Sequence, residues 1–187
     1  IFIKESAPNK PKISITGPIP WTNSALDLPD LPEKTVALFD VQPMREIFYK
    51  FLLHDLDYYV PRTSELFIKD SYKIVNELQG TLAFKKKKEI SNISHNQYKN
   101  FVKKLEQKPN LIFIDPEISA YELIEKSKAV ISMPFTSTGP MAKYMGKPSV
   151  YYDPTKLIQK NDPASHGIEI INDPMVLKEW LKGIFDK

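Results

Sequence analysis

Short runs of consecutive apolar residues alternate along the chain with stretches in which apolar residues recur every three or four positions. The short runs are mostly rich in β-branched and aromatic residues, which is typical of strands covered on both faces of a parallel sheet. They lie at 13–16, 35–39, 81–84, 111–114, 129–132, 149–152 and 167–171. We therefore expect an open, mostly parallel sheet.

The stretches with helical periodicity fall between these runs. Met44–Leu52 follows Pro43, and Phe67–Leu78 is closed by Gly80, a common residue just beyond a helix end. Shorter helices are expected over 98–105, 122–127, 141–144 and 177–184. The alternation predicts a doubly wound, Rossmann-like α/β fold, in one domain spanning 1–187. The Pro- and Asp-containing stretches 21–34 and 156–165 are expected to be loops.

Composition narrows the range of functions. The 187 residues include no Cys, which excludes disulfide scaffolds and thiol catalysis, and no apolar run is long enough to cross a bilayer. The net charge of +3 is too small to indicate nucleic-acid binding by itself. Because the chain begins at Ile1 rather than Met, we expect a piece of a longer polypeptide whose amino-terminal half is missing.

Parallel sheets bind ligands at the carboxyl ends of their strands, so the segments that follow the strands are the first candidates. Pro134–Gly139 follows a buried strand, opens a short helix and carries three adjacent hydroxyl residues. Such a segment suits an anion such as phosphate, with ordinary helix capping as the alternative. Neither a Walker loop nor a GxGxxG motif is present.

Other polar residues follow strands as well. In a continuing strand, at most two of the lysines Lys85–Lys88 would face one ligand, and a solvated edge is the alternative. Asp40, Asp115 and Asp153 each follow a strand. An Asp in this position can accept a hydrogen bond from a ribose hydroxyl, act as a general base or hold a turn through its side chain. His166 is a candidate substrate contact beside the last strand. The spacing of the histidines predicts no metal site.

One part of the chain resembles a known family. Ile114-Asp115-Pro116, Ala129–Ser132, Phe135–Gly139 and Gly146-Lys147-Pro148 follow one another as in the carboxyl-terminal half of GT-B glycosyltransferases. More narrowly, they resemble bacterial surface-polysaccharide biosynthesis proteins. The resemblance implies a donor domain for capsule, lipopolysaccharide or related glycan assembly, which binds a nucleotide sugar as substrate and needs no further cofactor.

The resemblance also assigns roles to individual positions. Thr136, Ser137 and Thr138 would contact the donor phosphates, with Gly139 allowing close approach. Asp115 and Pro116 would lie beside the donor's base, and Lys85 would lie near the base or sugar. Asp153 and His166 are further candidates for contact with the base or sugar because of their positions beside strands, and the resemblance does not assign them. Relatives often carry Lys-Pro-His-Pro at the position of Lys85, and this chain has neither the His nor the Pro. A leaving-group role for histidine is therefore not assigned there.

The implied partners are a nucleotide sugar, a glycan or lipid-linked glycan acceptor and the missing amino-terminal domain, with no nucleic acid. That missing domain would supply the general base, so this piece alone is expected to transfer nothing. We expect a cytoplasmic location, with the cytoplasmic face of the inner membrane as a further option. A sugar-nucleotide epimerase of the same fold and a non-catalytic interaction domain remain as alternatives.

Overall fold

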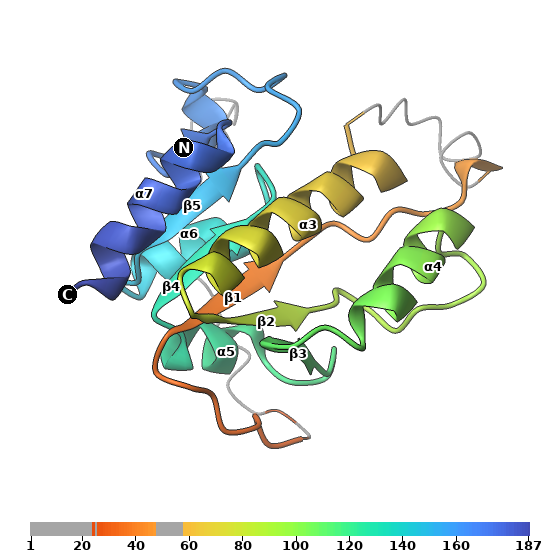
Figure 1. Ribbon diagram of the computed structural model, residues 1–187. Helices are drawn as coiled ribbons and strands as arrows, with labels where there is room; N and C mark the ends of the chain where they lie inside the picture. The colour runs from red at the N-terminus through yellow and green to blue at the C-terminus, as the bar shows by residue number, and fades with distance from the viewer. Residues whose placement is uncertain (1–23, 25, 48–57) are drawn as a thin grey trace, which may run out of the picture.

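The computed structural model describes residues 24, 26–47 and 58–187 (Figure 1). Six parallel strands form one sheet in the order β3-β2-β1-β4-β5-β6. The strands are β1 (Thr35–Phe39), β2 (Thr81–Lys85), β3 (Leu111–Ile114), β4 (Ala129–Ser132), β5 (Ser149–Tyr152) and β6 (Glu169–Ile171). The predicted doubly wound α/β fold is confirmed.

Helices cover both faces of the sheet (Figure 1). They are α3 (Pro61–Glu77), α4 (Asn96–Leu105), α5 (Ala120–Lys126), α6 (Thr138–Tyr144) and α7 (Pro174–Phe185), with a 3₁₀ turn η1 at Pro163–Ser165. The helices α3, α4 and α7 pack on one face, and α5 and α6 on the other. Each strand therefore lies between two apolar layers.

Alternate residues of each strand enter opposite layers. Val36 and Leu38 of β1 pack with Phe67 of α3, whereas Ala37 and Phe39 pack with Leu123 of α5. Because side chains alternate along a strand, continuous apolar runs such as 35–39 fill both layers at once. The burial of these central strands explains why the runs were readable in the sequence.

Side chains define several helix starts. The Ser119 hydroxyl accepts a hydrogen bond from the Tyr121 N–H at the start of α5. The Asp173 carboxylate accepts one from the Met175 N–H at the start of α7, where Pro174 is the first helical residue. Both are caps that pair N–H groups left unbonded in the first helical turn.

The structure corrects one predicted start. The helical residues begin at Glu46, whereas Met44 forms an isolated antiparallel bridge with Ser94, next to a hydrogen bond from the Arg45 N–H to the Ile93 carbonyl. This pairing joins positions far apart in the sequence, which local periodicity does not report. The rest of that predicted helix from residue 48 onward, and the strand predicted at 13–16, lie outside the described residues.

The strand order places a topological switch point between β1 and β4. The chain winds outward from β1 through β2 to β3 and then returns to β4 on the other side of β1. The loops that leave β1 and β4 consequently diverge, and an open sheet binds ligands in the crevice that this leaves.

Candidate functional site

A pocket of about 830 Å³ opens at this switch point. Its lining comes from the segments that follow β1, β2 and β4, together with the turn between β3 and α5. The volume falls within the range of roughly 300–1,000 Å³ that is usual for small-molecule sites. The site is therefore built by the carboxyl ends of four neighbouring strands.

The turn between β4 and α6 forms one wall, and Thr136, Ser137 and Thr138 all line the pocket. The Thr136 hydroxyl donates to the Met133 carbonyl at 2.8 Å, and the hydroxyls of Thr138 and Ser132 lie 2.8 Å apart. Ser137 is the residue before α6, but its side chain makes no capping hydrogen bond. Capping therefore does not account for the exposed Ser137 hydroxyl.

Two tyrosine hydroxyls form hydrogen bonds with backbone carbonyl groups of this turn. The Tyr59 hydroxyl donates to the Pro134 carbonyl at 2.9 Å, and the Tyr151 hydroxyl donates to the Thr136 carbonyl at 2.9 Å. A Cβ atom at Gly139 would lie 2.5–2.8 Å from the Tyr151 ring. Gly139 thus faces Tyr151, and the absence of a side chain lets this ring pack beneath the turn.

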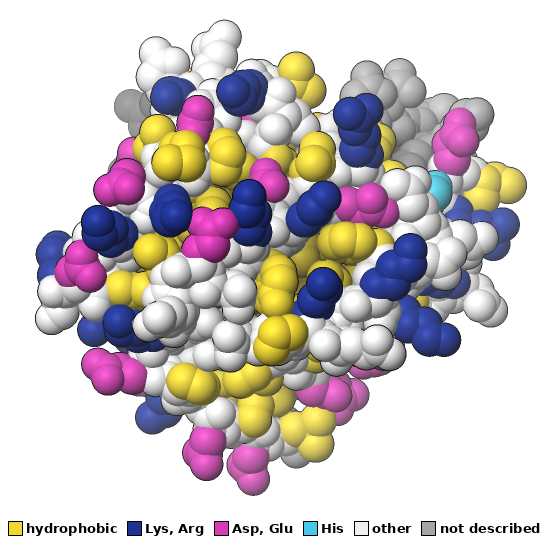
Figure 2. Space-filling model, in the orientation of Figure 1, with side chains coloured by type: hydrophobic (Ala, Val, Ile, Leu, Met, Phe, Trp, Pro, Cys, Tyr) yellow, Lys and Arg dark blue, Asp and Glu magenta, His cyan; other side chains and the backbone are white. Residues whose placement is uncertain are grey.

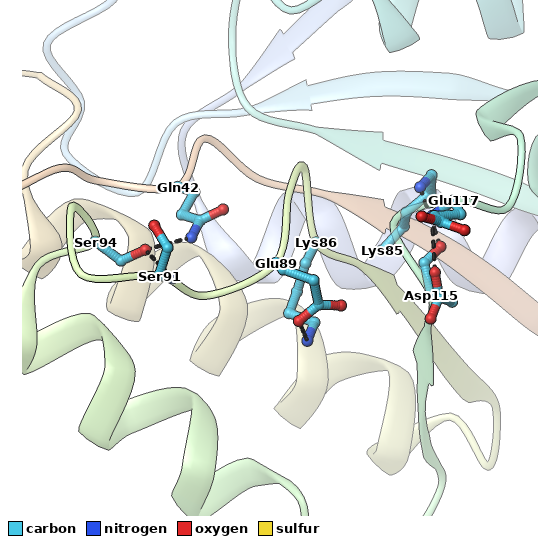
Figure 3. Close-up of polar contacts among 8 residues, drawn as sticks. All are labelled: Gln42, Lys85, Lys86, Glu89, Ser91, Ser94, Asp115 and Glu117. Atoms are coloured by element: carbon cyan, nitrogen blue, oxygen red, sulfur yellow. Dashed lines mark hydrogen bonds and ion pairs between the residues drawn. The ribbon is translucent and has the colours of Figure 1, made fainter.

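Lysines form the opposite wall, since Lys85, Lys86, Lys87 and Lys88 all line the pocket. The expectation that at most two would face one ligand assumed a continuing strand, and this condition is not met, because β2 ends at Lys85 and the chain then bends. Figure 3 shows Lys86 paired with Glu89 at 3.6 Å. The lining also includes Glu117 and Asp40, so positive charge is in slight excess.

Lys85 differs from the lysines that follow it. It is buried, and its Nζ donates to the carbonyl oxygens of Asp115 at 3.2 Å and Pro116 at 2.7 Å. Burial lowers the pKa of Lys85, while the nearby Asp115 carboxylate acts in the opposite direction. These bonds fix the turn after β3 against the end of β2, so Lys85 shapes the pocket as well as lining it.

Asp40 lies at the end of β1, on the pocket lining, and is 5% exposed. Its Oδ2 accepts a hydrogen bond from the Tyr98 hydroxyl at 2.6 Å, whereas its buried Oδ1 has no hydrogen-bond partner. Burial raises the pKa of Asp40 to about 7, although the Tyr98 hydrogen bond and the charge of Lys87 oppose this shift. A carboxyl group in this state changes charge near neutral pH.

The remaining predicted site residues are dispersed. Pro116 lines the pocket, while Asp115 accepts from the Glu117 N–H within its own turn, as Figure 3 shows. Asp153 is fully buried and bonds Tyr58, Thr155 and the Ile158 N–H. His166 lies beyond η1, and its carbonyl accepts from Lys143. Neither Asp153 nor His166 lines the pocket.

Sequence reasoning missed several lining residues. Gln42 Nε2 donates to the Ser94 hydroxyl at 2.7 Å, and the same hydroxyl accepts from the Ser91 N–H at 3.1 Å (Figure 3). All three residues line the pocket and tie the segment after β1 to the one before α4. Gln42 follows a predicted strand and could have been selected on that ground, but nothing local marks Ser91 or Ser94.

A parallel sheet of this order, with a pocket at its switch point, defines a Rossmann-like α/β domain of the kind that binds ligands at its strand ends. The family described as polysaccharide biosynthesis PFTS motif protein matches residues 1–181. The chain therefore belongs to that family. Its sequence contains Pro134-Phe135-Thr136-Ser137, of which Phe135, Thr136 and Ser137 line the pocket. The resemblance to polysaccharide-biosynthesis proteins is thereby supported.

Solved structures with a similar fold include the UDP-GlcNAc 2-epimerase from Methanocaldococcus jannaschii, with a TM-score of 0.51, 11% identity and 84% of this chain covered. The KpsC β-Kdo 2,4-transferase of Thermosulfurimonas dismutans has a TM-score of 0.40 and 13% identity, with 65% of this chain covered. TarM has a TM-score of 0.46 and 12% identity, with 84% of this chain covered. The chain spans 39%, 35% and 30% of these proteins, respectively. At such identities the likeness to the epimerase shows the fold alone.

Two further observations complete the comparison. No curated protein matches the chain in sequence. Within the part of the chain that the structure describes, no helix is both long and apolar enough to cross a membrane.

Proposed function

We propose that the pocket binds the nucleotide-sugar donor of a glycosyl transfer in surface-polysaccharide biosynthesis. The observation that carries the proposal is the convergence of a lysine wall and a hydroxyl-bearing turn on one pocket at the switch point of the sheet. The family's place in polysaccharide biosynthesis supports a glycan substrate. The donor's nucleotide and sugar, and the transfer itself, are part of this proposal.

The two walls suit different parts of such a donor. Lys87 and Lys88 supply charge for the phosphates, and the exposed Ser137 hydroxyl supplies a hydrogen bond to a phosphate oxygen. During transfer an acceptor oxygen bonds to the sugar's anomeric carbon and its proton passes to a general base, while the bond from that carbon to the phosphate oxygen breaks and negative charge grows on the leaving phosphate. Lysines near that oxygen stabilise the charge more in the transition state than in the bound donor.

Direct titration tests the proposal. UDP-, GDP- and CMP-sugars are titrated calorimetrically into the protein and into the variants Ser137→Ala and Lys87→Gln/Lys88→Gln. The affinity for one of the donors should fall about threefold to tenfold in the first variant and at least about tenfold in the second. The matched control Lys126→Gln/Lys182→Gln removes the same charge from exposed positions outside the pocket and should leave the affinity unchanged.

The outcomes separate the alternatives. Absence of binding by every donor, or an equal loss in the control variant, would contradict a donor site in this pocket and favour an interaction domain. A donor that binds and is recovered with an inverted sugar carbon, as followed by NMR, would instead indicate an epimerase. Binding with the predicted ranking of variants would support the donor domain.

A further inference from the structure

Positive charge is concentrated in one segment that leads away from the pocket. Residues 85–108 contain eight lysines and two glutamates, a net charge of +6, in a chain whose total is +3. The remaining residues therefore carry a net charge of −3. In Figure 2, Lys and Arg side chains lie on the side of the molecule where α4 lies in Figure 1, and others are spread over the rest of the visible face.

The lysines of α4 lie on the side of this helix that faces away from the core. Its inward side is formed by Tyr98, Val102 and Leu105, which are buried in the core. The opposite side, here called the α4 face, consists of Asn96, Gln97, Lys99, Asn100, Lys103 and Lys104. No ion pair engages the three lysines of the α4 face within the described residues. Their charge is thus available to a partner.

The α4 face is continuous with the mouth of the pocket. Ser91, Ile93 and Ser94 line the pocket, and His95 caps the first turn of α4 directly after them. A chain lying along α4 would therefore reach the pocket at the amino-terminal end of this helix. Lys86–Lys88 lie on the adjoining pocket wall, and the next lysine along the chain is Lys99, in α4.

The chemistry of the α4 face favours one class of partner. No large apolar side chain is exposed on α4, which a helix lying in a membrane surface would need. No aromatic ring is exposed there for stacking on bases, because Tyr98 is fully buried and Phe101 packs against the core. Amide side chains next to lysines are suited to sugar hydroxyls next to carboxylates or phosphates.

We propose that the α4 face is the docking surface for a negatively charged glycan chain, the acceptor whose end enters the pocket. Only the statement that this glycan is the acceptor rests on the proposed function. The affinity of the α4 face for an acidic glycan is a separate property, which can be measured whether or not a donor binds.

Charge reversal on the α4 face tests this proposal. Polysialic acid serves as the acidic glycan and dextran as the neutral one, and binding to the full chain is measured by surface plasmon resonance. Lys99→Glu/Lys103→Glu/Lys104→Glu should weaken polysialic acid binding at least tenfold. The control Lys126→Glu/Lys160→Glu/Lys182→Glu changes net charge equally at exposed positions elsewhere and should stay within twofold of the unmodified chain. Because the interaction is electrostatic, raising the salt concentration should also weaken it.

Several results would overturn the proposal. Equal losses in both triple variants would show that only net charge matters, and equal binding of dextran would remove the role of glycan charge. Binding to vesicles of anionic phospholipid or to single-stranded DNA, lost in the α4 variant while polysialic acid does not bind, would assign the α4 face to another partner. If the charge reversal prevents folding by circular dichroism, Lys99→Gln/Lys103→Gln/Lys104→Gln replaces it with the same expected ranking.

Donor titration with the same variants separates this proposal from the proposed function. The three lysines of the α4 face do not line the pocket, so donor affinity should be unchanged in the α4 variant. A loss of donor binding in that variant would contradict a surface separate from the donor site. Glycan binding without any donor binding would contradict the proposed function and retain the α4 face as an acidic-glycan surface.

Discussion

The carboxyl group of Asp40, at the end of β1, has a pKa that differs from that of an ordinary aspartate. It is buried beside the pocket with one oxygen bonded by Tyr98 and the other without a partner. The loss of water raises the pKa of this carboxyl to about 7, against an ordinary value of 3.8. In the folded protein Asp40 therefore retains a proton in a pH range where it would be ionised in the unfolded chain.

This difference predicts a pH-dependent stability. Between pH 4 and 7 the folded state binds more protons at Asp40 than the unfolded state, so its contribution to stability is greatest at low pH and declines as pH rises through this window. Above about pH 7 both states are ionised at Asp40, and the decline from this group stops. Asp40→Asn should flatten the decline between pH 5 and 7.

Urea denaturation at half-unit pH intervals, for the unmodified chain and Asp40→Asn, provides the measurement. Tyr98→Phe is a useful control, because it removes the hydrogen bond to Oδ2 but leaves the carboxyl buried, so the decline should persist. If the free energy of unfolding changes with pH in the same way for the unmodified chain and for Asp40→Asn, the raised pKa is contradicted.

At the scale of elements, local sequence predicted the sheet better than the site. The strand runs were readable because burial on both faces leaves consecutive apolar residues, as at Val36–Phe39 and Ala129–Ile131. The helix expected from Met44 begins at Glu46 instead, because Met44 forms a bridge with Ser94, a partner distant in sequence. The arrangement of the lysines after β2 was not predicted, because alternation does not encode the point at which a strand ends and the chain bends.

The residues of the site likewise fall into those that a sequence pattern could find and those that it could not. The turn Thr136–Thr138 could be found from its hydroxyls after a buried strand, and the structure places it on the pocket. The pairing of Asp40 with Tyr98 spans 58 positions, so no local pattern could report it. Asp153 follows a strand exactly as Asp40 does in sequence terms, yet Tyr58 and the turn at Thr155 occupy its carboxylate. Position after a strand therefore selects candidates without separating binding from turn formation.

The turn between β4 and α6 carries a backbone constraint of its own. Phe135 has φ of 61°, in the left-handed region that non-glycine residues rarely adopt, and its partly exposed ring lies on the pocket lining. The bonds from Tyr59 and Tyr151 to the adjacent carbonyl groups hold this geometry. Left-handed residues of this kind are often found at functional sites.

A pair of substitutions tests the constraint. Phe135→Gly and Phe135→Ala remove the same ring, but only glycine adopts the left-handed conformation without steric cost. The glycine variant should be more stable than the alanine variant by about 1 kcal/mol, the reverse of the usual order in regular elements. Thermal denaturation of both variants gives the comparison, and an alanine variant of equal or higher stability would contradict the left-handed turn.

The whole molecule combines a neutral-to-acidic body with one basic segment. The rest of the sheet and the other helices form the body, while residues 85–108 carry the positive charge of the pocket wall and α4. The net charge of the chain concealed this division, since +6 and −3 sum to only +3. Placement of the lysines by the fold, and not their number, is what indicates an anionic ligand in the pocket and an anionic partner beside it.

The central claim is that a nucleotide sugar binds between the Thr136–Thr138 turn and the Lys85–Lys88 wall. A crystal structure of the protein soaked with the tightest-binding donor tests this most directly. We predict donor phosphate oxygens within hydrogen-bonding distance of the Ser137 hydroxyl and of at least one of Lys87 and Lys88. A donor bound elsewhere on the chain, or a pocket left empty at saturating donor, would contradict the claim.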